Sequence, residues 1–107
     1  FLAQATFGPT TAAITGLQGG NFAAWIDNQI ATPATLHTPL VVARRAELLA
    51  ARGSDGWQSP RQQAWWQVAL TAPDQLRQRM AFALSQIFVV SQFGVLDTEH
   101  EGTARYY

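Results

Sequence analysis

Residues 71–91, with the sequence TAPDQLRQRMAFALSQIFVVS, decide the fold class of this chain. The stretch opens with a proline and an aspartate, which are helix-start signals. From residue 81 to residue 90 only Ser85 and Gln86 are polar. A helix that is apolar on nearly all sides must be buried on nearly all sides. The pattern therefore predicts a central hydrophobic helix over about residues 73–92, surrounded by other helices.

Helix signals recur along the rest of the chain, whereas no stretch alternates apolar and polar residues for more than a few positions. Asn21 is a good N-cap, and Thr38-Pro39 and Ser59-Pro60 each supply an N-cap followed by a first helical proline. After a short helical turn over residues 1–7, the expected helices run from Thr10 or Thr11 to Gly19-Gly20, then over about 22–31, 39–52, 60–70 and 73–92.

These elements predict an all-α fold, an orthogonal or antiparallel assembly of about five helices around the central one. The short link at residues 71–72 favours an antiparallel hairpin between helix 60–70 and the central helix. We expect residues 1–107 to form a single helical region. Because both ends are apolar or aromatic, we also expect this region to be part of a larger domain that continues beyond them.

Composition excludes several classes of function. The seven basic residues are all arginine and the formal net charge is zero, so the chain has no basic field for nucleic acid. No apolar run approaches the roughly 18 residues of a transmembrane helix. The chain contains no cysteine, which excludes disulfides, thiolate metal sites and cysteine nucleophiles.

The densest polar cluster, at residues 97–101, holds three carboxylates and one imidazole. Such groups can bind a divalent metal, but ligands adjacent in sequence are a weak signal. A helix start explains the acids better, because Thr98 and Glu101 fit a capping box. We therefore predict no metal site. His100, flanked by Glu99 and Glu101, is a candidate general base if downstream residues orient it.

Arg79 enters an apolar helix without a local acid, whereas Arg77 has Asp74 three residues earlier. A buried guanidinium needs a partner, so we predict a distant structural one, such as Asp27, an acid of residues 97–101, or a group beyond this region. The alternative is that Arg79 holds an anion or the carboxylate of a ligand. Unchanged folding stability of Arg79→Met would argue against the structural role.

Two further side chains lie in predicted loops. Trp57 stands among small and polar residues, where an exposed indole is a candidate ligand-binding group. The other three tryptophans, at positions 25, 65 and 66, lie in predicted helices and are expected to pack in the core. His37 has no acidic neighbour in sequence and is expected to be a surface or capping group.

Four segments resemble one bacterial family. They are FLAQATFGPT at residues 1–10, FAAWIDNQI at 22–30, AWWQVALTAPDQLRQRMAFALSQIFVVS at 64–91 and GTARYY at 102–107. Together they are similar to the family called domain of unknown function 1800. The resemblance covers nearly the whole chain and corresponds to the N-terminal quarter of a typical member. It implies a larger, mostly helical and often exported protein, hence a periplasmic or secreted location. It implies no reaction, cofactor or catalytic residue.

The sequence thus predicts a helical scaffold or interaction segment whose partner is the remainder of its own chain, with a protein partner also possible. Two alternatives stay open. The region is the N-terminal part of an enzyme completed by C-terminal residues, with Arg79, Glu99, His100 and Glu101 as candidate groups, or it is a surface or polymer-binding module that uses Trp57.

Overall fold

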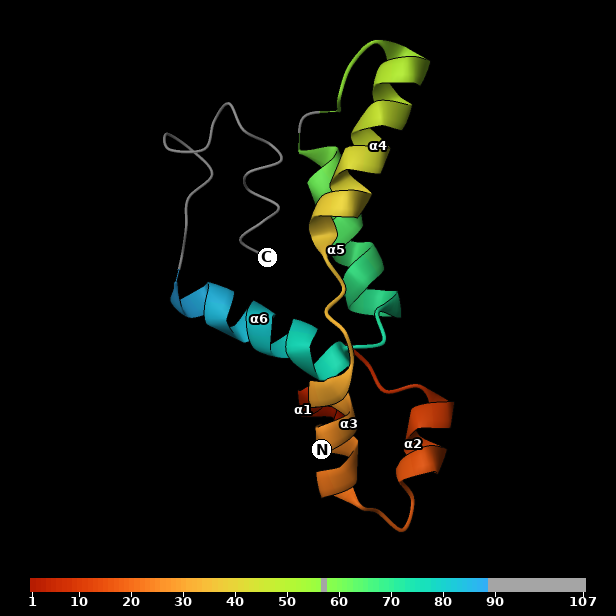
Figure 1. Cartoon of the computed structure of the whole chain (residues 1–107), viewed down its shortest axis with the longest axis vertical. Helices are drawn as coiled ribbons and strands as arrows, with labels where there is room; N and C mark the ends of the chain where they lie inside the picture. Colours follow the sequence, from red (N-terminus) through yellow and green to blue (C-terminus); the bar gives the residue numbers. More distant parts are fainter. Residues whose placement is uncertain (57, 89–107) are drawn as a thin grey trace.

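The computed structural model of the chain describes residues 1–56 and 58–88, and this part contains six helices and no strand. The all-α prediction is therefore confirmed for these residues. Figure 1 shows the arrangement of the helices. They are α1 (Leu2–Ala5), α2 (Thr11–Leu17), α3 (Phe22–Ala31), α4 (His37–Arg52), α5 (Ser59–Thr71) and α6 (Gln75–Ile87).

Local capping chemistry sets several helix ends as predicted. The Thr10 hydroxyl accepts a hydrogen bond from the Ala13 N–H at 3.1 Å, and α2 begins at the next residue. The Asn21 side chain accepts one from the Ala24 N–H at 3.0 Å at the start of α3. Gly53 ends α4 with a left-handed backbone of φ 66°, which glycine adopts without strain.

Two helix starts differ from the prediction. Helix α4 begins at His37, two residues before Pro39, and α5 begins at Ser59, one residue before Pro60. Proline is tolerated throughout the first turn of a helix because the N–H groups there have no intrahelical partner. A proline therefore marks the first turn of a helix without fixing its first residue.

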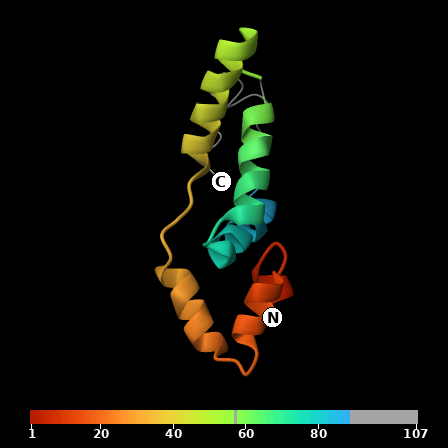
Figure 2. The same ribbon diagram turned by 90° about the vertical axis from the view of Figure 1, so that its right-hand side faces the viewer.

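Helices α4 and α5 lie side by side and antiparallel (Figures 1 and 2). Their contact buries Val41, which is 1% exposed, against Ala64, which is 3% exposed, with Leu40 packed beside them. The predicted hairpin between α5 and α6 is wrong, because α6 instead runs across the long direction of this pair (Figure 1). The sequence showed a short link after α5 but did not specify the angle of the turn.

Helix α6 is not enclosed by the described part of the chain, contrary to the prediction of a surrounded central helix. Gln78 is its only buried residue. Four large apolar side chains, Met80, Leu84, Ile87 and Phe88, are 46–71% exposed at and just after its C-terminal half. An apolar helix pattern predicts burial, but helical periodicity does not show which segment would bury the helix. Predicted helix residues 89–92 lie outside the described residues.

No helix in the described ranges is both long and apolar enough to cross a membrane.

Truncating the α4–α5 contact should destabilise the fold. Val41→Ala removes two methyl groups from a fully buried position, and we expect a loss of roughly 2 kcal/mol in the free energy of unfolding. Val42→Ala is the matched control, because Val42 is 43% exposed. Urea unfolding followed by circular dichroism measures both variants, and equal losses would contradict the α4–α5 packing.

Candidate functional site

A buried carboxylate lies at the start of α6. Asp74 is the N-cap residue of that helix, and its side chain is fully buried, with 0% exposed. Its Oδ2 atom accepts hydrogen bonds from the Thr35 N–H and from Gln78 Nε2, both at 3.0 Å. Gln78 Nε2 also donates to the Thr35 carbonyl at 3.0 Å. Asp74 and Gln78 together hold the loop before α4 against the first turn of α6.

Helix α3 is attached to the same turn by two long polar side chains. Gln29 donates from Nε2 to the Pro73 carbonyl at 3.1 Å and accepts at Oε1 from the Leu76 N–H at 3.0 Å. The second bond satisfies one of the N–H groups that a helix start leaves without an intrahelical partner. Arg77 Nη2 donates to two carbonyl oxygens at the C-terminal end of α3, at 3.0 and 3.1 Å.

Gln75 connects a third part of the chain to this turn. Its Nε2 donates to the carbonyls of Ala69 and Ala72, at 3.1 and 2.9 Å, and its Oε1 accepts from the Phe7 N–H at 3.2 Å. The end of α5 and the segment after α1 are thereby held together. We call this set of side chains the α6-start network; it consists of Gln29, Asp74, Gln75, Arg77 and Gln78.

The charge of Asp74 is stabilised by its neighbours. Burial raises the pKa of a carboxyl group, but the hydrogen bonds from Thr35 and Gln78 outweigh that effect and lower the pKa of Asp74 below its ordinary value. Arg77 Nε, 3.7 Å from Oδ2, adds a partly exposed positive charge. Asp74 is therefore ionised at neutral pH although it is sealed from solvent. Its second oxygen, Oδ1, is buried without a hydrogen-bond partner.

His37 lies in the interior near Asp74, so its prediction as a surface or capping loop residue is wrong. It is the first residue of α4 and only 6% exposed, and its Nδ1 atom is buried without a hydrogen-bond partner. Burial lowers the pKa of His37, and the negative charge of Asp74 raises it by less, so the imidazole is held neutral. The acidic neighbour is 37 positions away in sequence, and no local pattern indicated it.

The chemistry available to His37 and Asp74 is limited by access. An imidazole and a carboxylate can act in acid–base catalysis only where a substrate reaches them, and both are buried. Residues 1–56 and 58–88 also contain no group of three or more side chains that could hold a metal ion. The hydrogen bonds themselves join α3 and the loop before α4 to the first turn of α6.

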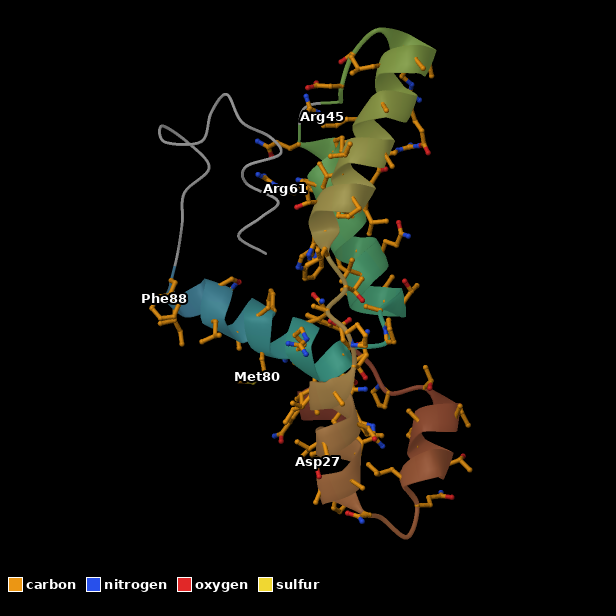
Figure 3. All side chains as sticks on the ribbon, in the orientation of Figure 1. Asp27, Arg45, Arg61, Met80 and Phe88 are labelled. Atoms are coloured by element: carbon orange, nitrogen blue, oxygen red, sulfur yellow. The ribbon has the colours of Figure 1, made fainter. Side chains whose placement is uncertain are left out.

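Arg79 lies against aromatic rings and forms no ion pair within the described ranges. Its guanidinium carbon is 5.4 Å from the centroid of the Phe7 ring and 5.6 Å from that of Phe82. The predicted partner Asp27 is exposed and lies on α3 (Figure 3). No ion pair joins Asp27 to Arg79. The apolar sequence neighbours of Arg79 indicated that its charge needs a partner. They did not indicate that this partner would be the faces of aromatic rings, one of which is distant in sequence.

The rings beside Arg79 form a continuous cluster. Phe7, Trp65 and Phe82 contact one another with centroid distances of 5.7–5.9 Å, and Trp66 packs edge-on against Trp65 at 4.8 Å. Trp66 is 59% exposed, so its expected burial in the core is wrong. We call Phe7, Trp65, Trp66 and Phe82 the aromatic cluster. It gives this side of the molecule a partly exposed apolar surface next to a positive charge.

The other sequence candidates are not placed by the structure. Trp57 and the residues Glu99, His100 and Glu101 lie outside the described residues, so their proposed roles stay predictions. Sequence reasoning missed the α6-start network. The signals were Asp74 at a helix start, Gln75 and Gln78 in the following turn and Gln29 in α3, which have ordinary explanations as a cap and as surface residues.

The geometry defines an all-α region joined by a polar network around a buried carboxylate. The chain belongs to the family described as Protein of unknown function (DUF1800), whose model matches residues 1–106. This match confirms the resemblance found in the sequence, and its description assigns no reaction. Neither the curated proteins nor the solved structures include a match to the chain.

Removing the Asp74 carboxylate should be costly. Asp74→Ala leaves the Thr35 N–H and one Gln78 donor without their acceptor in the interior, so we expect a loss of at least about 2 kcal/mol in the free energy of unfolding. Asp27→Ala is the matched control, because Asp27 is exposed. Urea unfolding at neutral pH compares the two, and a loss no larger than that of Asp27→Ala would contradict the bonding described.

Acid should weaken the fold in two steps. His37 has a lowered pKa in the folded protein. Its contribution to folding stability is therefore complete above pH 6.5, the ordinary pKa of histidine, and is lost as the pH falls towards its folded pKa. Asp74 also has a lowered pKa, and its contribution is lost only below 3.8. We expect urea stability to fall between these two values in the chain with His37 and to fall less in His37→Gln.

The measurement is cleanest in a His100→Gln background, which leaves one imidazole because the chain has two histidines. The His37 ring protons, followed by NMR, should titrate below 6.5. A midpoint at or above that value would refute the burial of a neutral imidazole.

Proposed function

We propose that this region is a helical scaffold segment of a larger bacterial protein and that it packs through α6 against the remainder of its own polypeptide. The observation that carries the proposal is an exposed apolar stripe on that helix. Met80, Leu84 and Ile87 follow one another at spacings of four and three residues, and they are 55%, 46% and 71% exposed. Such spacing places side chains on one face of a helix.

The stripe is an unusual surface for a protein in water. Covering one Leu, Ile or Met side chain contributes roughly 1.5 to 3 kcal/mol, and adjacent exposed side chains of this kind mark contact sites. Phe88 extends the stripe beyond the helix end and is 68% exposed. Figure 3 shows Met80 and Phe88 along α6, away from the α4–α5 pair.

The rest of the structure supports a scaffold role. The α6-start network holds the first turns of the helix, and Phe82 packs towards Phe7 and Trp65. The large apolar side chains that remain exposed leave helix surface for further structure to cover.

We also propose that the protein is exported and acts in the periplasm or outside the cell. The support is the resemblance to a family whose members are larger and often exported. Cell fractionation of a bacterium that expresses the natural protein tests this location, and recovery in the cytoplasm alone would contradict it.

A double substitution tests the packing of α6. In residues 1–107 alone, Leu84→Gln with Ile87→Gln should change the free energy of unfolding by less than about 0.5 kcal/mol, because both side chains are already exposed. In the longer natural polypeptide the same pair should cost about 2 kcal/mol or more, because they are then buried. Urea unfolding measures both forms.

Leu36→Gln is the control, because Leu36 is 64% exposed and precedes α4. It should have a small effect in both forms. If the longer polypeptide tolerates the double substitution as well as the control, α6 does not pack against the remainder of the chain. Association of the longer polypeptide with a second protein through these residues would likewise replace the proposal.

A further inference from the structure

We propose that Arg79 and the aromatic cluster form a recognition site for a carboxylate that stands next to an apolar or aromatic group. The site goes beyond the scaffold role and uses a different face of α6 from the apolar stripe. Arg79 and Phe82 are three residues apart and share the face that packs towards Phe7. Loss of the site and loss of α6 packing are therefore separable.

The orientation of the Arg79 guanidinium is set by two ring faces. Phe7 and Phe82 attract the cation through their ring faces, and this attraction involves none of its five N–H donors as hydrogen bonds. Residues 1–56 and 58–88 supply no hydrogen-bond acceptor to these donors. Arg79 is half-buried. Its nitrogen atoms have no hydrogen-bond partner in these residues and are not buried, so the donors reach solvent.

Arg79 differs in this respect from Arg44 and Arg77. Arg44 pairs with Glu47 at 2.7 Å, and Arg77 donates to the end of α3 and lies near Asp74. Their guanidinium groups already have polar acceptors. The Arg79 guanidinium is held in place by apolar surfaces and still offers a planar fork of donors, which is the geometry that binds a carboxylate through two parallel bonds.

The surroundings select the class of ligand. One guanidinium matches the single charge of a carboxylate, whereas a phosphate carries more charge and is usually bound by several cations or helix N–H groups. The exposed face of Trp66 continues the apolar surface beside the charge. It favours a carboxylate with an attached ring or apolar side chain. Such a group can come from a free aromatic acid or from an acidic side chain of a polypeptide.

Two ligand pairs test the site and distinguish the sources. Benzoate and its neutral analogue benzamide probe a free acid, and N-acetyl-Glu-Phe-amide and its Gln analogue probe a peptide acid. NMR follows the Arg79 Nε–H and the indole N–H signals of Trp65 and Trp66 in the 107-residue chain. We expect the acid of at least one pair to shift the Arg79 and Trp65 signals at millimolar concentration, and its neutral analogue to shift them far less.

Variants connect the binding to the guanidinium. Arg79→Gln should weaken the acid about tenfold or more, and Arg79→Lys should weaken it less, because a lysine keeps the charge but not the fork. Arg52→Gln removes an equal charge from an exposed position and should leave binding unchanged. Circular dichroism melts show whether each variant is folded. If Arg79→Gln is not folded, Arg79→Lys takes its place in the binding test.

Several results would overturn the proposal. The proposal is refuted if neither acid shifts the Arg79 signal or if the neutral analogues bind as well as the acids. It is also refuted if Arg79→Gln and Arg52→Gln weaken binding equally. Inorganic phosphate binding as tightly as either acid would show a general response to anions and would also refute the site. Each of these results leaves the packing of α6 intact, because that packing is measured on Leu84 and Ile87.

Discussion

A single buried charge, that of Asp74, joins the loop before α4 to the first turn of α6. Asp74 is sealed from water, and leaving an ionised carboxylate there unsolvated would be very costly. The Thr35 N–H and the Gln78 amide supply the donors that water would otherwise supply. Gln78 lies four residues after Asp74 at the start of the same helix, whereas Thr35 can donate only when the loop before α4 lies against the first turn of α6. The desolvation penalty of Asp74 therefore strongly favours the arrangement in which the loop before α4 contacts the start of α6.

This dependence is greater because the apolar core is small. The buried cluster between α4 and α5 consists of Val41 and Ala64 with Leu40 beside them, and most other large apolar side chains remain partly exposed. Hydrophobic burial is non-directional, so a small core stabilises many similar arrangements of helices. Hydrogen bonds are directional. Glutamine is well suited to this task, because one Gln29 side chain both donates to Pro73 and accepts from Leu76.

Local structure could be predicted from the sequence, and long-range structure could not. Thr10, Asn21 and Gly53 set helix ends through interactions within a few residues, so their roles follow from residue type and position. The environment of His37 depends on Asp74, and that of Arg79 depends on Phe7, which are distant in sequence. The apolar run that begins at residue 81 predicted a helix surrounded by others, whereas Leu84, Ile87 and Phe88 are exposed in the described part of the chain.

The network lies at the start of α6 for a geometric reason. Helix α6 has 13 residues and is roughly 20 Å long, because each residue adds about 1.5 Å. A small change in direction at its first turn therefore becomes a displacement of several ångströms at Ile87. The first turn is held from three sides, by α3 through Gln29 and Arg77, by the loop before α4 through Asp74 and Gln78, and by the end of α5 through Gln75. Contacts to three separate segments fix both the direction and the rotation of a helix, whereas contacts to one segment would leave it able to pivot. Rotation matters here, because it determines which way the aromatic face with Arg79 and the apolar face with Leu84 point.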